Sequence, residues 1–559
     1  MSQTIPFETI TTDLLIIGGG TAGPMAGIKA KKKNPEADVL IVDKATVKRG
    51  GSICRGMDAY NNVTIPGEAT VDEYVEAVDI ISDGIQDKKV NRVLAENSFQ
   101  MLKDLEEWGA AAFPRNEDGS FMVQQFHPKG KFLTEMRGDI KPVMAKLCKK
   151  LGVRTMDRTM ATRVLTDAQG RATGATLLNV RTGECTLCKA KTVLICTGSN
   201  GRFNLPDTGF LFGSFDCPFN AGEGLSMVYE AGGELCNMEH HIFSPMIKDF
   251  EGPGHSTFTR YGAYLINAEG ERFMLNYHEK GERAPSGIRG MAMRREVVEG
   301  RGPLYYDLRH LDAETVEIIK DGLFSCERPT EKEFFQNRNI DIGKDLIELT
   351  VSGPNICGGH GLAGVKVDET ARTTVPNLYA AGDVASTCMG FVGAAWVFGS
   401  LAAEDAVSRL DEIQAPEVDE ADARAEFQRL LAPLHRDEGL EAKEVEYKIR
   451  RMVKPYLASP KHGGRMESAL RLVRQYRGEI DQIKVQDLHG VMKANEISSI
   501  LDTVEMSLQA SLFRTESRWG YGHYRSDFPE KSPEWDGCRV VVRKNADTNA
   551  METVKETVA

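Results

Sequence analysis

Three glycines and one aspartate near the start of the chain have the types and spacing of a site for a dinucleotide. Residues 13–20 read DLLIIGGG, and with the next glycine they form Gly18-x-Gly20-x-x-Gly23 directly after an apolar stretch. Glycines let the backbone turn tightly and approach a pyrophosphate, whose charge is stabilised by the N-terminus of the helix that follows. Asp43 comes roughly 20 residues later, where a carboxylate can hold ribose hydroxyls. Residues 1–43 therefore predict a strand–helix–strand unit that binds a dinucleotide.

Two later segments have the character of strands that return to the same domain. Residues 192–198 (TVLICTG) end in Thr197-Gly198, and residues 377–383 (NLYAAGD) end in Gly382-Asp383. The region between them, 221–352, contains alternating polar and apolar stretches of its own. This order predicts an α/β protein in which a smaller α+β domain is inserted into a nucleotide-binding domain.

The character of the chain becomes helical after Ala415-Pro416. Between residues 497 and 512, apolar residues recur on one face of a helix, which predicts a helical domain over 416–535. Residues 536–559 are expected to form a C-terminal tail. Their polar end, 545–559, is expected to be poorly ordered.

Composition excludes several classes of function. The chain has 559 residues, which suggests about two to four domains or subdomains. A net charge of −12 argues against broad binding to nucleic acid or to an anionic membrane. The longest uncharged stretch, 389–403, is too short to span a membrane, and the first ten residues do not have the pattern of a secretory signal. A cytoplasmic protein without direct membrane insertion is therefore expected.

The cysteines do not have the pattern of a metal or iron–sulfur site. There are 11 of them, scattered along the chain, and Cys185-x-x-Cys188 is the only pair with that spacing. Iron–sulfur clusters usually need four thiolates, and no second pair follows. The number and spread of the cysteines suit reduced thiols, and no bound metal is expected.

The combined order of motifs resembles the FAD-binding flavoproteins of the succinate dehydrogenase/fumarate reductase superfamily. It runs from the glycine turn and Asp43 through Thr197-Gly198 and Gly382-Asp383 to a helical C-terminal region. Several more segments resemble motifs of that family: 220–224 (NAGEG), 232–235 (GGEL), 238–239 (ME), 270–273 (GERF), 299–302 (EGRG), 516–518 (ESR) and 525–529 (RSDFP). Within the superfamily, segments 43–45, 49–56, 59–61, 107–109 and 357–360 are most similar to the alpha subunit of adenylylsulfate reductase.

This resemblance implies the fold and the cofactor. It implies a discontinuous, Rossmann-like FAD-binding domain (residues 1–220 and 353–415), an α+β capping domain over the substrate (221–352) and the helical domain. Fumarate reductases bind FAD covalently through a histidine, and Gly51 stands at that position, so non-covalent FAD is expected. The residues expected to bind FAD are Gly18, Gly20, Thr21, Ala22, Gly23, Asp43, Lys44, Gly50, Gly51, Ser52, Asn61, Thr197, Gly198, Gly382 and Asp383. Asn61 is expected near the flavin ring, although Asn61-Asn62 is also good turn sequence.

Four residues are candidates for substrate binding or proton transfer. His360 lies in a glycine-rich loop that the resemblance places in the substrate site. Arg289 and Arg260 could each bind an anion, or each could be an ordinary salt-bridge arginine. His241 is a weaker candidate, because His240 and His241 on one strand would point to opposite faces and at most one should face the cleft. The alternative is one buried and one exposed histidine without a role in the site.

Departures from the family concern the substrate. Fumarate reductases have a histidine where Ser244 stands and a carboxylate-binding arginine where residues 393–400 read GAAWVFGS. The sulfate-type relatives have two arginines where residues 240–247 read HHIFSPMI. A dicarboxylate would lose a charged hydrogen bond worth about 1.5–3 kcal/mol. We therefore expect a less charged substrate, and Trp396 and Phe398 are either an aromatic wall for it or core residues.

The function expected from these features is two-electron chemistry on a small organic substrate at FAD. The resemblance implies a flavoprotein component that exchanges electrons with an iron–sulfur, ferredoxin-type subunit. The alternatives are the alpha subunit of adenylylsulfate reductase, a fumarate reductase or succinate dehydrogenase, a self-contained flavin dehydrogenase, and a flavin electron carrier without substrate chemistry.

Overall fold

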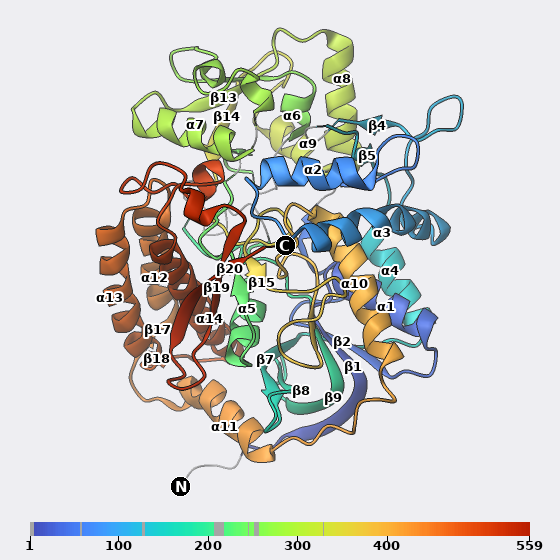
Figure 1. Cartoon of the computed structure of the whole chain (residues 1–559), viewed down its shortest axis with the longest axis vertical. Coiled ribbons are helices and arrows are strands. Elements are labelled where there is room, and N and C mark those ends of the chain that lie inside the picture. Colours follow the sequence, from blue (N-terminus) through green and yellow to red (C-terminus); the bar gives the residue numbers. More distant parts are fainter. Residues whose placement is uncertain are drawn as a thin grey trace.

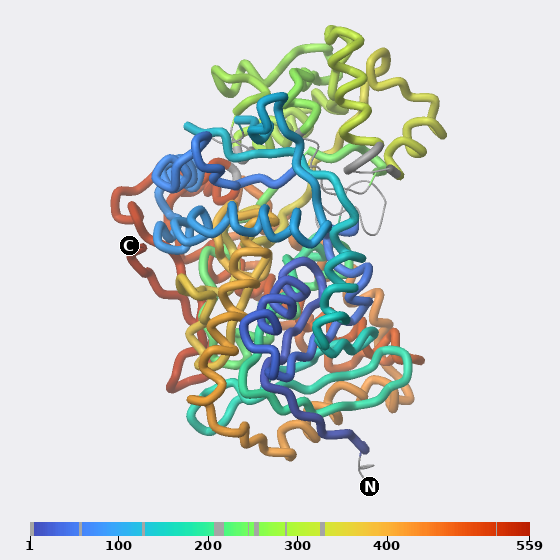
Figure 2. Tube along the Cα trace, turned by 90° about the vertical axis from the view of Figure 1, so that its right-hand side faces the viewer, coloured from blue at the N-terminus to red at the C-terminus, as the bar shows by residue number. Residues whose placement is uncertain are grey.

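A computed structural model describes residues 5–55, 59–125, 129–205, 217–243, 245–250, 256–284, 286–327 and 329–558. Gly56 and Ser244, which the motif comparison used, lie outside these residues. Figures 1 and 2 show an elongated molecule, with the segment around residues 260–350 at one end and the N-terminus at the other. In the described part of the chain, no helix is long and apolar enough to cross a membrane.

A largely parallel sheet forms the centre of the nucleotide-binding region. Strand β1 (Glu8–Ile17) pairs in parallel with β2 (Val39–Asp43) on one side and with β9 (Cys185–Ile195) on the other. The remaining strands extend this sheet: β16 (Leu378–Ala380), β6 (Arg154–Asp157), β7 (Thr159–Thr166) and β8 (Ala172–Asn179). The inner strands have continuous runs of buried aliphatic residues because helices or other strands cover both faces. The expected strand–helix–strand unit and the two returning strands all lie in this sheet.

Helices α1 (Ala22–Lys33) and α10 (Phe391–Ser408) pack on one face of this sheet, and α10 is apolar on almost every side. Three further helices pack around these two: α4 (Ile140–Lys150) against α1, α3 (Lys88–Glu107) against α10, and α2 (Val71–Ile81) against α3. Trp396 and Phe398 on α10 are fully buried, and Trp396 meets the ring of Tyr60 edge-on with centroids 5.0 Å apart. These two aromatic residues are therefore core residues, which favours that interpretation over an aromatic wall. A helix with apolar residues on every side is stable only when it is buried in this way.

The segment drawn in lime and yellow at the top of Figure 1 has a hydrophobic core of its own. Its antiparallel sheet has the order β11 (Pro245–Ile247), β14 (Ile347–Val351), β13 (Leu304–Asp307) and β12 (Tyr264–Ile266). Helices α6 (Ser256–Arg260), α7 (Ser286–Val298), α8 (Ala313–Asp321) and α9 (Pro329–Asn337) accompany it. We call these elements the cap.

The C-terminal region combines helices with a β-hairpin. The helices are α11 (Glu420–Leu431), α12 (Ala442–Leu457), α13 (Gly463–Ile480) and α14 (Leu488–Phe513), and α5 (Glu223–Glu230) packs against α14. Strands β19 (Cys538–Lys544) and β20 (Met551–Thr557) then pair along their whole length. The expectation of a poorly ordered tail was wrong, because Val540, Val541 and Val542 are buried and Arg543 pairs with Glu552 across the hairpin.

The hairpin also joins regions that are far apart in sequence. Strand β10 (Leu235–Cys236) pairs with β19 on one side and with β15 (Gly364–Val365) on the other. One sheet therefore contains strands from the three regions assigned to different domains. Two smaller sheets complete the fold: β3 (Ala59–Asn61) with β4 (Val123–Gln124) and β5 (Leu133–Glu135), and β17 (Leu440–Glu441) with β18 (Ile483–Lys484). The division into four segments stays a prediction.

A buried ion network connects the nucleotide-binding sheet to the C-terminal helices. Glu496 on α14 is fully buried and contacts Lys44 at 2.8 Å, Arg202 at 2.5 Å and Lys493 at 2.9 Å. Lys44 also pairs with Glu223 on α5. Burial raises the pKa of Glu496, but the cations around it outweigh that effect and hold its pKa below the usual range. The carboxylate therefore stays charged and holds three cations together.

Replacing the central carboxylate should destabilise the protein. Glu496→Gln keeps the shape of the side chain but removes the carboxylate that Lys44, Arg202 and Lys493 share, which should lower the free energy of unfolding by about 3–5 kcal/mol even though Lys44 keeps Glu223 and Arg202 keeps Glu446. Urea unfolding followed by circular dichroism measures this. Glu467→Gln, at an exposed position on α13, is the matched control and should change little. Equal unfolding curves for the two variants would contradict the assigned role of Glu496.

Candidate functional site

Backbone hydrogen bonds hold three turns at one edge of the central sheet. The amide of Gly18 donates to Val42 at 2.9 Å, that of Cys196 donates to Ile17 at 2.7 Å, and that of Ala381 donates to Ile195 at 2.9 Å. The glycine turn, Thr197-Gly198 and Gly382-Asp383 thus follow the carboxyl ends of β1, β9 and β16. Ligands of open α/β sheets bind at this edge.

Two glycines shape the turn that precedes α1. Gly18 has φ of +110°, and a Cβ atom there would lie 2.3 Å from the carbonyl oxygen of Cys196. Gly51 has φ of +87°, and its Cβ atom would lie 2.6 Å from the Cα atom of Gly20. The loop with Gly50, Gly51 and Ser52 therefore packs directly onto the turn. With the N-terminus of α1 at Ala22, the two segments present main chain rather than side chains to a ligand.

The acidic residue after β2 is held in a fixed orientation. The amide of Gly19 donates to Asp43 Oδ2 at 2.7 Å, and the amide of Ala45 donates to Asp43 Oδ1 at 2.6 Å. Each carboxylate oxygen keeps a second lone pair for a sugar hydroxyl. The neighbouring Lys44 is different, because its ammonium contacts Glu223 and Glu496 and the two carboxylates raise its pKa against the opposing effect of burial. The side chain of Lys44 is therefore occupied in the ion network, and sequence spacing alone could not identify its partners.

Several buried polar atoms around these turns have no hydrogen-bond partner in the described protein. They include Asn61 Oδ1, Thr197 Oγ1 and Ser199 Oγ. An unsatisfied buried polar atom is unfavourable by about 1–3 kcal/mol, and such atoms mark sites where a ligand belongs. Together with the glycine turn and Asp43, these groups fit a dinucleotide that carries sugar hydroxyls and a polar ring.

The His360 loop lies directly beside the Asp383 turn. The amide of Gly358 donates to the carbonyl of Asp383 at 2.9 Å. One potential ligand atom from each of Cys357, His360 and Asp383 lies within 4.8 Å of the other two. A thiol, an imidazole and a carboxylate could also bind a metal, so the expected absence of a metal stays a prediction. The geometry thus brings the candidate histidine within reach of a ligand held at Gly382-Asp383.

A loop with three residues in the left-handed region connects this histidine to Asn61. Cys388, Met389 and Phe391 have φ of 46°, 56° and 48°. Such strain in non-glycine residues concentrates at functional sites. The amide of Phe391 donates to Gly359 at 3.1 Å, and the ring of His360 meets that of Phe391 edge-on with centroids 4.8 Å apart. Asn62, next to Asn61, donates to the carbonyl of Met389.

Arg289 lies on α7 of the cap, which packs against the segment that leads into the cap. Gly290, next to it on α7, packs against Phe243, and Ile242 beside Phe243 donates to the carbonyl of Asn355 at 3.1 Å, two residues before Cys357. The guanidinium of Arg289 donates to the carbonyl of Glu282 at 3.0 Å, and its Nε has no partner among the described residues. Burial lowers its pKa, although arginine remains charged. Arg289 is thus a partly buried cation without a paired carboxylate in that part of the chain.

Arg260 and the adjacent histidines are arranged differently. Arg260, at the end of α6, donates to Thr257 Oγ1 at 3.2 Å and lies beside the ring of Tyr261. His240 and His241 are both buried and lie outside any strand, so the expectation of one buried and one exposed histidine was wrong. His241 Nε2 lies 2.6 Å from Ser507 Oγ on α14. The ring is thus enclosed at the contact between α14 and the segment that leads into the cap, and a role for His241 in the site stays a prediction.

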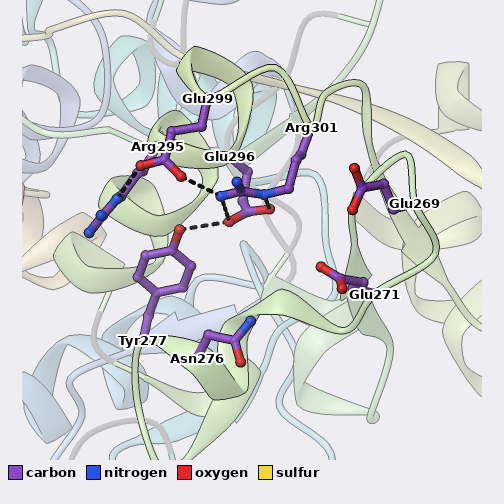
Figure 3. A pocket seen from close by; sticks show the side chains of 8 residues that line it. All are labelled: Glu269, Glu271, Asn276, Tyr277, Arg295, Glu296, Glu299 and Arg301. Carbon is purple, nitrogen blue, oxygen red and sulfur yellow. Dashed lines mark hydrogen bonds and ion pairs between the residues drawn. The ribbon is translucent and has the colours of Figure 1, made fainter.

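The cap carries a separate pocket of about 500 Å³, shown in Figure 3. Eight residues line it: Glu269, Glu271, Asn276, Tyr277, Arg295, Glu296, Glu299 and Arg301. Arg301 bridges Glu296 and Glu299, and its hydrogen bonds lower the pKa of Glu296 to about 2. Every lining residue belongs to the cap, so this acidic pocket is distinct from the edge of the central sheet.

The sequence pattern missed Lys141 at the start of α4. Its side chain is buried, and its ammonium donates to the carbonyl groups of Gly19 and Gly20 within the glycine turn. The only signal in the sequence is a lysine near the start of a helix, which is usually a solvated residue.

Comparison with protein families agrees with this geometry. Residues 13–396 match the model described as FAD binding domain, and residues 446–558 match that described as fumarate reductase flavoprotein C-term. The chain belongs to the succinate dehydrogenase/fumarate reductase flavoprotein superfamily. It is thus an FAD-dependent oxidoreductase, and the resemblance seen in the motifs is confirmed.

The similarity to known relatives extends along almost the full length of this flavoprotein. One subunit of the fumarate reductase (CoM/CoB) of Methanothermobacter marburgensis is 27% identical, with 96% of this chain and 98% of the relative covered. The alpha subunit of adenylylsulfate reductase from Megalodesulfovibrio gigas is 26% identical, with 93% and 91% covered. The solved adenylylsulfate reductase of Archaeoglobus fulgidus superposes with a TM-score of 0.90 at 23% identity, covering 99% of this chain and 97% of that one. That structural likeness confirms the expected α/β fold.

The contact between Gly51 and Gly20 should be needed for FAD binding. In the flavoprotein, Gly51→Ala would force a Cβ atom to 2.6 Å from Gly20, displace the glycine turn and lower the ratio of FAD to protein by at least about tenfold. Flavin absorbance of the purified protein measures this. Gly67→Ala is the matched control, because Gly67 has φ of +88° with nothing within 4 Å of its Cβ position. Normal FAD content in Gly51→Ala would refute the importance of this contact.

Proposed function

We propose that this protein is the flavin-binding component of a two-component oxidoreductase that acts on a small organic molecule of low negative charge. Bound FAD supplies two-electron chemistry. The observation that carries the proposal is the packing of the His360 loop against Gly382-Asp383, and the cap adds Arg289 as a candidate cation. This arrangement combines a cofactor edge, a titratable side chain and a cation, which are the parts needed to bind and protonate or deprotonate a substrate.

We propose that FAD is held without a covalent bond. Gly51 stands where fumarate reductases have the histidine that bonds to the flavin, and a glycine has no side chain to react. The backbone of the glycine turn, Asp43 and the unsatisfied atoms of Asn61 and Thr197 would hold the cofactor by hydrogen bonds alone. Acid precipitation would then release all of the flavin into the supernatant.

The low charge of the substrate follows from the cations around the site. Segment 393–400 forms part of the buried helix α10 and has no arginine, so a dicarboxylate would lack the partner that fumarate reductases provide. The two arginines of the sulfate-type relatives are also missing from 240–247. Arg289 remains as one bidentate donor, which suits a single carboxylate or a polarised carbonyl.

We assign proton transfer to His360 and anion binding to Arg289. The imidazole lies in a loop fixed by main-chain hydrogen bonds on both sides, from Gly358 and from Phe391. An imidazole fixed in this way can act as a general acid or base toward a bound substrate. Arg260, at the end of α6, is a secondary candidate for binding an anion.

The electron partner is proposed to be an iron–sulfur, ferredoxin-type subunit. Relatives along the whole chain are named as subunits of fumarate reductase and adenylylsulfate reductase. This chain has a single Cys-x-x-Cys pair, Cys185 and Cys188, in strand β9. Residues three apart in a strand point to opposite faces, so the two thiols cannot bind one cluster together. A cluster that accepts the electrons would therefore come from another chain.

Replacing His360 should slow the chemistry and leave the cofactor bound. His360→Asn keeps a polar side chain but removes the titratable group, and should lower the rate of flavin reduction about 10²- to 10⁴-fold. The assay is anaerobic stopped-flow spectroscopy with an organic compound that bleaches the flavin of the wild type. His489→Asn, at an exposed position on α14, is the control and should react normally. Unchanged reduction by His360→Asn would remove this histidine from the proposal.

The same preparation separates the alternatives. A flavin that responds to sulfite, together with AMP-dependent reduction of an acceptor, would indicate an adenylylsulfate reductase instead. Full turnover of the isolated chain with oxygen or a nicotinamide nucleotide would contradict the iron–sulfur partner. Bleaching of the oxidised flavin by succinate-type dicarboxylates alone, or reoxidation of the reduced flavin by fumarate-type dicarboxylates alone, would contradict the low substrate charge.

A further inference from the structure

A buried lysine touches the glycine turn of the FAD site. Lys141 lies at the start of α4 and is only 3% exposed. Its ammonium donates to the carbonyl of Gly20 at 2.5 Å and also to that of Gly19. These two carbonyl groups immediately precede Thr21 and the N-terminus of α1. The positive charge is thus fixed beside the point where a helix N-terminus meets a phosphate.

The charge of Lys141 is not balanced by an ion pair within the described chain. Its hydrogen-bond partners there are the two main-chain carbonyl groups. The ionisable groups that face it are Cys54, Asp43, Cys148 and Asp157. Asp43 accepts from Gly19 and Ala45, and Asp157 accepts from Val47. A buried cation without a bound counter-charge is unfavourable unless an anion arrives from outside.

Lys44 provides the contrast. It is half-buried, and two carboxylates compensate its charge and raise its pKa. Burial instead lowers the pKa of Lys141, to about 8. The charge of Lys44 is therefore balanced by carboxylates of the protein, whereas the charge of Lys141 can be balanced by an anionic ligand.

We propose that Lys141 is the cation that neutralises the pyrophosphate of FAD. Its ammonium is anchored to the turn by Gly19 and Gly20, so it is held in place before the anion binds. The pyrophosphate would then accept hydrogen bonds from main-chain amides of the glycine turn and the N-terminus of α1, and from the Lys141 ammonium of α4. Nothing in the spacing of the glycine motif indicates this lysine, because it lies 122 residues from Gly19 in the sequence.

The pH dependence of FAD binding follows from this role. Without cofactor, Lys141 loses its proton as the pH rises through about 8. A bound pyrophosphate raises the pKa of a neighbouring ammonium, so binding above that pH takes up one proton. FAD affinity should therefore be constant below the pKa of the free protein. Above it, affinity should fall by up to about tenfold per pH unit until the pKa of the complex is reached.

The experiment measures FAD binding to the apoprotein between about pH 6 and pH 10 by quenching of flavin fluorescence. Lys141→Met should weaken binding about 10- to 100-fold at neutral pH and abolish the pH dependence above 8. Lys141→Arg keeps a charge that does not titrate in this range, so it should bind FAD at high pH at least as well as the wild type binds it at neutral pH. Lys146→Met, exposed on the same helix, should behave as the wild type.

Displacement of FAD by ADP identifies the part of the cofactor involved. ADP has the pyrophosphate but lacks the flavin, so Lys141→Met should lower the affinities for ADP and for FAD by the same factor. A wild-type pH profile in Lys141→Met would overturn the proposal. So would a loss of FAD binding in which ADP affinity is kept, because that result would place the lysine against the flavin ring.

Two features keep this test independent of folding and of the proposed function. The thermal midpoint of each apoprotein shows whether a variant is folded, and Lys141→Arg supplies a charged variant if Lys141→Met does not fold. The measurement needs no substrate and no partner protein. The role of Lys141 can therefore fail while the proposed chemistry holds, and the reverse is equally possible.

Discussion

The parallel alignment of β1, β9 and β16 is the constraint on which the site depends. Because these strands run in the same direction, their carboxyl ends meet at one edge, and main-chain hydrogen bonds between them fix where each turn begins. The segments concerned are far apart in the sequence, yet the sheet brings their turns together. The cap is inserted between β9 and β16, so its attachment to the FAD edge is set by the same alignment.

Charge is used in two different ways around this edge. On one side, Glu496 gathers Lys44 and Arg202 into a compensated network that joins the sheet to α14. On the other side, Lys141 and Arg289 are buried or half-buried without a carboxylate partner among the described residues. Compensated charges hold elements together, whereas uncompensated ones are positioned for an anion that comes from outside. The distinction depends on three-dimensional partners and cannot be made from residue type.

Features that depend on local signals are predictable from the sequence, and features that depend on three-dimensional partners are not. The glycine turn, the strand that ends in Asp43 and the returning strands were predictable, because glycine spacing and apolar runs are local signals. The fold is confirmed, and the individual site residues stay predictions. The hairpin of β19 and β20 is not predicted from the sequence, because β20 is rich in charged residues, of which Glu552 and Glu556 pair with arginines of β19. The sequence predicts a strand at His240 and His241, whereas the structure has none there. Their conformation depends on contacts with α14, which the neighbouring residues in the sequence do not indicate.

Separating the cofactor site from the substrate site gives this fold its chemical range. In the proposed arrangement, the main chain of the glycine turn and groups on α1 and α4 bind the phosphates of FAD, and none of these groups belongs to the cap. The substrate would meet side chains from the cap and from the loops around residues 357–361 and 388–391, the second of which has a strained backbone. The missing arginine on α10 would then change the charge that a substrate can carry without disturbing the cofactor. A flavoprotein built this way can keep one redox centre while its substrate changes, which is why the motifs identify FAD so clearly and the substrate so poorly.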